Sequence, residues 1–159
     1  MKTRTYDYEP PADLARFAHL SGLQALRGML TREIPGPPIM ATLGFQLVEV
    51  AQGSAVFEGT TADWQYNPLG TVHGGWMSTL LDSALACAVH STLQPGQLYT
   101  TLDLQVRFVK ALHATSGTVR AEAKVVHAGK RIATAEAKLV GSDGTLYATA
   151  TTSCLVTAL

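Results

Sequence analysis

The sequence has few cysteines, no long hydrophobic run and no excess of charge of either sign. Its two cysteines, Cys87 and Cys154, both lie within apolar stretches. Two isolated cysteines of this kind favour reduced core side chains in a cytoplasmic protein over a disulfide framework. No stretch approaches the roughly 18 uncharged apolar residues of a membrane-spanning helix, and the first residues, MKTRTYDYEPPADLAR, lack the apolar segment of a secretory signal. We therefore expect a cytoplasmic protein that has no membrane partner.

Charged residues make up only 15% of the chain, and the 12 basic side chains balance the 12 acidic ones. The sequence contains no basic block and no interleaved aromatic residues, so nucleic acid is not expected as a partner. A neutral chain with so little charge tends to self-associate, and this predicts a homo-oligomer. A chain of 159 residues with 47% hydrophobic content is long enough to bury a single core.

Hydrophobic periodicity divides the chain into an accessory N-terminal part, residues 1–40, and a main domain, residues 41–159. Residues 1–11 resemble a flexible arm, and the apolar spacing that follows predicts one helix over about 13–30. The sequence IPGPPI then interrupts the helix. From Thr42 the period changes to two, which predicts two successive strands.

The second half of the main domain alternates more clearly. A long apolar helix is followed by four predicted strands, joined by short turns that imply antiparallel pairing. In the first of them, TTLDLQVRFVK, one face carries the apolar residues and the other begins with Thr101. The apolar face consists of Leu102, Leu104, Val106 and Phe108. This order of elements predicts an α+β fold in which a curved antiparallel sheet of about six strands wraps around the long helix.

One carboxylate stands inside the predicted helix, in the segment NPLGTVHGGWMSTLLDSALACAVH from Asn67 to His90. This helix is apolar over most of its circumference and must therefore be largely buried. An ionised carboxylate without partners is very costly in such a place. Asp82 is therefore satisfied by local donors, held neutral, or directed into a cleft or a subunit interface.

Two glycines, Gly74 and Gly75, stand where this helix begins. The first N–H groups of a helix have no intrahelical acceptor and favour negative charge. Because glycine has no side chain, a ligand can approach these donors closely. Such donors suit the oxyanion that develops on an ester or thioester carbonyl. The simpler interpretation is that both glycines only permit close packing or an unusual turn.

Asn67, the HGG that begins the helix, and Asp82 together resemble the signature of the hotdog-fold acyl-CoA thioesterases, in particular the phenylacetate-degradation-type branch. The spacing is seven residues from Asn67 to Gly74 and eight from Gly74 to Asp82. The segments TTLDLQVRFVKA and GKRIATAEAKLVGSDGTLYATATTS are similar to the strand after the helix and the last hairpin of that family. The resemblance covers the main domain and leaves out the accessory N-terminal part.

The resemblance implies hydrolysis of an acyl-CoA thioester by four catalytic residues. Asp82 would act as the nucleophile or as the general base for water, and the Gly74 N–H would hold the oxyanion. Asn67 would position the carbonyl or the attacking water, and Thr101, or its neighbour Thr100, would orient water. In this family the site lies at a dimer interface, with Asp82 facing Asn67 and Gly74 of the other subunit, and the oligomer is a dimer or a dimer of dimers.

The remaining candidates belong to substrate binding. His73 is expected to form a hydrogen bond near the helix start and to shape the loop, rather than to act as a base. Aromatic residues before the motif are candidates to line an acyl or aryl pocket. Basic residues after HAG are candidates to contact the phosphates of coenzyme A, although solvated surface charge explains them as well. The candidate substrate-binding residues are His73, Gly75, Trp64, Tyr66, Lys130 and Arg131.

The expected hydrolase needs no cofactor, because coenzyme A enters as part of the substrate. The five histidines lack ligand spacing with other histidines, cysteines or acids, so no metal is expected. Two other functions stay open, a non-catalytic acyl-CoA-binding module and a hotdog hydratase or dehydratase. The latter resembles D-x-N-P-x-H, and Gln65 and Gly70 stand here at the acid and histidine positions. The aromatic residues near the motif suit an aryl or a medium-chain acyl group equally well.

Overall fold

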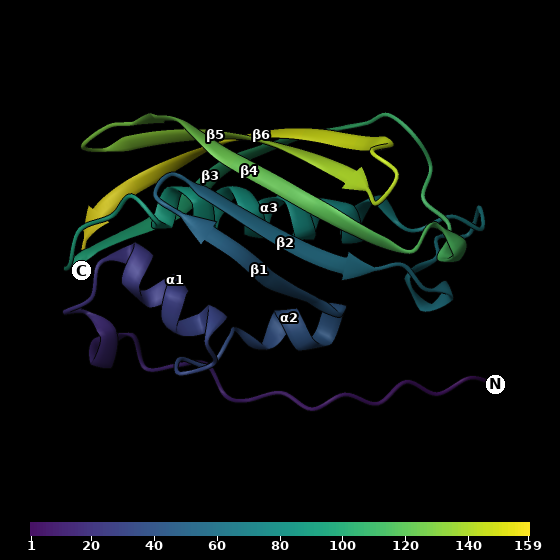
Figure 1. Cartoon of the computed structure of the whole chain (residues 1–159), viewed down its shortest axis with the longest axis horizontal. Helices are drawn as coiled ribbons and strands as arrows, with labels where there is room; N and C mark the ends of the chain where they lie inside the picture. Colours follow the sequence, from purple (N-terminus) through teal and green to yellow (C-terminus); the bar gives the residue numbers. More distant parts are fainter.

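Six antiparallel strands form a curved sheet around a long helix (Figure 1). The computed structural model describes the backbone of residues 1–159 and every side chain except that of Leu14. The strand order in the sheet is β1-β2-β4-β5-β6-β3, so β1 and β3 form its two edges. The strands are β1 (Phe45–Ala51), β2 (Ser54–Thr60), β3 (Gln97–Phe108), β4 (Thr118–Ala128), β5 (Ile132–Gly141) and β6 (Leu146–Ala158).

The long helix α3 (Gly74–His90) lies against the concave side of this sheet. It is buried on most sides, as its nearly uniform apolar sequence predicts. Two shorter helices, α1 (Gly22–Leu30) and α2 (Pro38–Leu43), lie below the β1 edge in Figure 1. The short 3-10 turns are η1 (Leu14–Phe17), η2 (Asp63–Gln65) and η3 (Ala114–Ser116).

Alanines on the inner faces of β4 and β5 allow the sheet to approach α3 closely. Ala121 and Ala123 on β4, and Ala133, Ala135 and Ala137 on β5, are each at most 5% exposed. Apart from Ile132, their outward neighbours are charged or polar, which is the alternation of a sheet with one solvated face. The α+β fold with a sheet of six strands around the helix is therefore confirmed.

The edge strand β3 departs from simple alternation. A register shift between Thr101 and Asp103 marks a β-bulge opposite β6. Because a bulge adds one residue to the strand, side chains beyond it change face. Thr101 and Leu104, predicted on opposite faces, thus both lie on the inner side, whereas Leu102 is 55% exposed and Phe108 52% exposed. The prediction of one continuous apolar face along this strand is therefore wrong for Leu102, whereas Phe108 stays on the face of Leu104 and is partly exposed at the end of the strand.

The single helix predicted over about 13–30 is also wrong. Asp13 caps only the 3-10 turn η1, accepting a hydrogen bond from Ala15 N. The backbone is then extended at Ser21, which starts α1 with a capping box: the Ser21 hydroxyl accepts from Gln24 N and the Gln24 side chain accepts from Ser21 N. A capping box needs a non-helical backbone at its first residue, so a continuous helix cannot pass through Ser21.

The helix α2 was missed in the sequence, where IPGPPI was interpreted only as an interruption. Pro38 occupies the first position of α2. The N–H at this position has no acceptor within the helix, so its absence in proline costs nothing, and the fixed φ of proline is already helical. Gly44 ends the helix with a φ of 68°, a left-handed conformation that glycine adopts without strain. Strand β1 therefore begins at Phe45 and not at Thr42.

The first residues form neither helix nor strand, but they contact the body of the protein. The Arg4 guanidinium donates to the carbonyl oxygens of Ala41 and Thr42 at 3.1 and 2.8 Å. It also stacks over the Trp64 ring at 4.1 Å, and Lys2 forms an ion pair with Asp63. The arm thus runs along α2, as Figure 1 shows.

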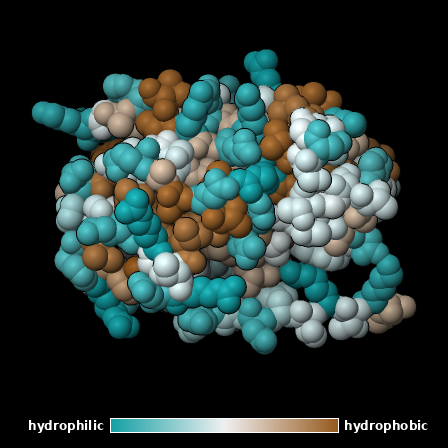
Figure 2. Space-filling view, viewed as in Figure 1, coloured by the Kyte–Doolittle hydropathy of each residue, from teal (hydrophilic) through white to brown (hydrophobic). Residues whose placement is uncertain are grey.

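Apolar and hydrophilic groups are interspersed over the face shown in Figure 2. This pattern agrees with the low charged content of the chain. None of the described helices is long and apolar enough to cross a membrane.

Candidate active site

Asp82 lies midway along α3 on the side that faces β3. The Thr101 hydroxyl donates a hydrogen bond to Asp82 Oδ1 at 3.3 Å. Partial burial raises the pKa of the Asp82 carboxyl, and the hydrogen bond from Thr101 opposes this rise with a smaller effect. The bulge in β3 follows directly after Thr101, and it puts Leu104 on the same face of the strand as Thr101.

A cavity of about 190 Å³ opens beside this carboxylate. Most of its lining is apolar, contributed by α1, the α1–α2 connection, α2, β2, α3 and β3. The lining residues are Met29, Pro37, Met40, Phe57, Asp82, Ser83, Ala86, Cys87 and Tyr99. Burial raises the pKa of the Cys87 thiol to about 12, so this thiol stays protonated at neutral pH. Asp82 is the lining residue that is suited to act as a base or a nucleophile.

The start of α3 holds the second part of the candidate site. His73 is the N-cap residue, and its Nδ1 accepts a hydrogen bond from Gly75 N at 2.8 Å, as the sequence predicts for a structural histidine. One of the two glycine donors is therefore already engaged. Gly74 is the first residue of the helix, so its N–H has no acceptor within the helix. A Cβ at Gly74 would lie 2.9 Å from the Phe108 ring. Phe108 thus covers one side of Gly74.

Asn67 organises the loop that leads to this helix. Its Oδ1 accepts from Leu69 N at 2.9 Å and from Thr71 N at 3.2 Å, and its Nδ2 donates to Thr71 Oγ1 at 2.9 Å. These are local Asx-type bonds that fix a tight turn. Asn67 therefore holds the 67–71 loop next to Gly74, and a second Nδ2 hydrogen remains for a ligand.

The two parts of the site are separated along α3. Gly74 and Asp82 are eight residues apart in one helix, which corresponds to about 12 Å at a rise of ~1.5 Å per residue. A reacting carbonyl has to lie within about 3–3.5 Å of its attacking atom. Within one chain, Gly74 and Asp82 thus cannot act on the same carbonyl.

The other predicted substrate contacts are not among the described residues that line the Asp82 cavity. Tyr66 lies near the start of α3, where its hydroxyl accepts from Ala114 N at 2.9 Å, and Trp64 lies under Arg4. Lys130 and Arg131 are exposed at the turn between β4 and β5. Among the described residues there is no group of three or more histidines, cysteines or acids placed to hold a metal.

The sequence did not indicate several residues of the cavity. Met29 and Met40 fall in the accessory N-terminal part, Phe57 in a predicted strand, and Tyr99 just before the predicted strand TTLDLQVRFVK. No spacing rule connects any of them to Asp82. The clustering of two methionines near a proline-rich connection was the one available signal, and it is weak.

Residues 69–148, which include the start of α3 and Asp82, match the thioesterase superfamily. The chain belongs to the thioesterase superfamily. Its α3-centred sheet is the hotdog fold, and the predicted resemblance is confirmed. A phenylacetic acid degradation-related protein of Ralstonia eutropha JMP134 is 32% identical, with a TM-score of 0.74 over 82% of this chain and 98% of that one.

Two further members of the superfamily come from other bacteria. A mutant of the phenylacetic acid degradation protein PaaI of Thermus thermophilus is 31% identical, with a TM-score of 0.67 over 74% of this chain and 97% of that one. The 1,4-dihydroxy-2-naphthoyl-CoA hydrolase of Listeria monocytogenes serotype 1/2a (strain 10403S) is 26% identical over 64% of this chain and 80% of its own length. In the present chain, the accessory helices α1 and α2 precede the residues that match the superfamily, 69–148.

Proposed function

We propose that the protein hydrolyses an acyl-CoA thioester to a free acid and coenzyme A. The observation that carries this proposal is Asp82, a partly buried carboxylate with one hydroxyl donor, placed at an apolar cavity on the central helix of a thioesterase fold. The curated relative from Listeria monocytogenes is named for hydrolysis of an aromatic acyl-CoA. Both observations favour hydrolysis over binding alone.

In the proposed reaction, Asp82 attacks the thioester carbonyl carbon directly or removes a proton from the water that does so. The carbonyl oxygen gains negative charge as the new C–O bond forms, and the Gly74 N–H stabilises that charge. The C–S bond then breaks, and the thiolate of coenzyme A leaves. If water attacked, the free acid forms in this step and the thiolate takes up the proton that Asp82 removed from the water. If Asp82 attacked, its mixed anhydride with the acyl group is next hydrolysed by water, which releases the acid, restores the carboxylate and supplies the proton for the thiolate. Thr101 orients the Asp82 carboxylate or the water beside it. No metal or further cofactor is required by these steps.

The separation of Gly74 from Asp82 supports a site shared between two copies of the chain. Strand β3 is an edge of the sheet and carries exposed apolar residues, an arrangement that favours pairing with another strand. We propose a dimer in which Asp82 and Thr101 of one copy face Gly74 and Asn67 of the other. Lys130 and Arg131, both exposed, are proposed to meet the phosphates of coenzyme A.

The proposed activity is tested by release of free thiol from a panel of aryl-CoA and short-, medium- and long-chain acyl-CoA esters. We expect steady release from at least one class of ester. Absence of release from every ester, with tight binding of the same esters, would contradict hydrolysis and support the binding module. Light scattering on the same sample is expected to give a dimer or a dimer of dimers.

The shared site is tested by a mixed dimer. Asp82→Asn and Gly74→Ala are each expected to be nearly inactive. Alanine keeps the N–H of residue 74, but its Cβ keeps the substrate carbonyl from approaching that donor closely. Within the protein this Cβ displaces only the half-exposed Phe108 ring. A twofold dimer has two equivalent sites, so a mixed dimer carries one site with both defects and one intact site, with about half of the wild-type rate. Differently tagged chains, co-expressed and purified through both tags, give this species. A mixed dimer as inactive as its parents would place all catalytic groups in one chain.

Thr101→Val is expected to shift the acidic limb of the pH profile of kcat/KM to higher pH. The Thr101 hydroxyl lowers the pKa of the Asp82 carboxyl, so its loss raises that pKa further, and the reactive carboxylate forms only at higher pH. The measurement is kcat/KM between about pH 4 and 8. Thr100→Val, at the exposed neighbouring position, is the matched control and is expected to keep the wild-type profile. Identical profiles for all three proteins would show that Thr101 does not act on Asp82.

A further inference from the structure

We infer that Met29 and Met40, on the accessory helices, set the size of the acyl group and restrict the substrate to an aryl or short-chain acyl thioester. This inference rests on the proposed thioesterase function. It concerns residues outside the segment that matches the superfamily, residues 69–148.

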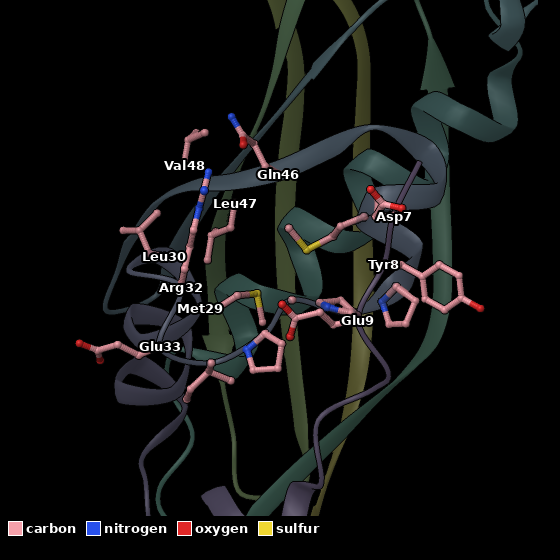
Figure 3. A pocket seen from close by; sticks show the side chains of 17 residues that line it. Asp7, Tyr8, Glu9, Met29, Leu30, Arg32, Glu33, Gln46, Leu47 and Val48 are labelled. Carbon is pink, nitrogen blue, oxygen red and sulfur yellow. The ribbon is translucent and has the colours of Figure 1, made fainter. Parts of the chain in front are cut away.

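Met29, Pro37 and Met40 are lining residues of two cavities at once. The first is the cavity of about 190 Å³ at Asp82. The second, of about 630 Å³, lies between the N-terminal arm, the α1–α2 connection and β1. Figure 3 shows Met29 in this second cavity, close to Leu47 of β1, with Tyr8 of the arm on the other side of the cavity. Because these three residues face both spaces, they form the wall that separates them.

The size of the Asp82 cavity limits what can lie next to the carboxylate. An apolar cavity of about 150 Å³ in another protein accommodates benzene. A cavity of about 190 Å³, with the Phe57 and Tyr99 rings in its lining, thus suits one aromatic ring or a short acyl chain. A longer chain has to displace a methionine side chain, which is flexible but occupies the space.

The wall is held in place by contacts with the main domain. At the start of α1, Gly22 N donates to the Leu93 carbonyl oxygen at 3.0 Å, next to the end of α3. At the end of α2, the Leu43 carbonyl oxygen accepts from Trp76 Nε1 at 2.8 Å. The Arg4 bonds to the carbonyl oxygens of Ala41 and Thr42 also hold this end of α2. Both methionines are therefore carried by helices that are anchored close to the site.

Removing the wall is expected to change the preference for acyl length. In Met40→Ala the two cavities join, so longer acyl chains gain space beyond the Asp82 cavity. We expect kcat/KM for a medium- or long-chain acyl-CoA to rise about 10-fold or more relative to that for an aryl or short-chain ester. Met29→Ala, on the other helix, is expected to produce a shift in the same direction. The measurement is kcat/KM over a series of acyl-CoA esters of increasing chain length.

Two controls separate wall removal from general loosening. Ile39→Ala lies on the same helix as Met40, is exposed and lines neither cavity, so its length preference is expected to match the wild type. Met40→Leu keeps a side chain of similar volume in the wall and is expected to keep the wild-type preference. Thermal unfolding of each variant shows whether the fold is intact. If Met40→Ala does not fold, Met29→Ala is the variant that tests removal of the wall.

The result that would overturn the inference is an unchanged length preference in folded Met40→Ala and Met29→Ala, or a wild-type preference for long chains. Either result would leave the proposed hydrolysis standing. Failure of the proposed function has a different signature, because the wild-type protein would then release no thiol from any ester. The same assay therefore distinguishes the two failures: the acyl-length series of the variants tests the methionine wall, and thiol release by the wild-type protein tests hydrolysis.

Discussion

Asp82→Asn is expected to lower kcat/KM by about 10²- to 10⁴-fold, the usual contribution of a positioned general base, and by more if the carboxylate is the nucleophile. Asparagine has nearly the same shape and still accepts the hydrogen bond from Thr101, but it can neither take a proton nor attack the carbonyl. The measurement is thiol release from the best ester of the wild type. Asp103→Asn, an exposed acid on the neighbouring strand β3, is the matched control with unchanged activity expected.

The same variant of Asp82 is expected to be more thermostable than the wild type at neutral pH. Burial raises the pKa of Asp82 in the folded protein, so its contribution to stability is present at low pH and is lost as the pH rises through the folded pKa. The asparagine side chain of the variant has no such titration. The difference in melting temperature should therefore grow from pH 4 to pH 7. Full activity of Asp82→Asn, or equal stability at both pH values, would contradict the role or the environment assigned to Asp82.

Gly22→Ala is expected to lower the free energy of unfolding by about 1–3 kcal/mol, the usual cost of overpacking. A Cβ at this position would overlap the backbone carbonyl oxygen of His90 and lie 2.6 Å from its ring. Backbone atoms cannot yield as a side chain can, so α1 has to move away from the end of α3. The measurement is chemical denaturation, together with the acyl-length series, because movement of α1 also displaces Met29.

Gly28→Ala is the matched control for this change. It lies in the same helix, and its added Cβ would lie 2.8 Å from Ile34 Cδ1, the far end of a flexible side chain. Alanine also has a higher helix propensity than glycine, by about 1 kcal/mol. The two effects oppose each other, and a change within about 1 kcal/mol is expected. Equal destabilisation by both substitutions would show that α1 does not depend on its close contact with α3.

The parts of the fold that the sequence predicts best are those with a strong period and a single buried face. The alternation of alanine with charged residues in β4 and β5 is visible in the sequence, and the structure buries those alanines as expected. The long apolar helix was recognised because it is too apolar to lie at a surface. An acid in so apolar a helix is unusual for the same reason, so the sequence alone indicates Asp82 as a candidate functional residue.

Local competition explains the parts that were predicted wrongly. Ser21 forms a capping box that starts a new helix, although the apolar spacing continues through it. Pro38 begins a helix, although the prolines around it usually end one. The bulge at Thr101 inserts one residue into an otherwise regular alternation. In each case two local rules apply to the same residues, and the tertiary contacts decide between them.

The sequence by itself determined the order of elements, the α+β class, the buried helix and the identity of the candidate acid, because each depends on residues that are near one another in the chain. Only the tertiary structure decided that Thr101 donates to Asp82, that Gly75 is engaged by His73, and that two methionines close the cavity. These contacts join residues through space or depend on the exact direction of a backbone. Hydrophobic periodicity indicates which side of a helix or strand is buried, but it does not indicate which residues of other elements contact that side.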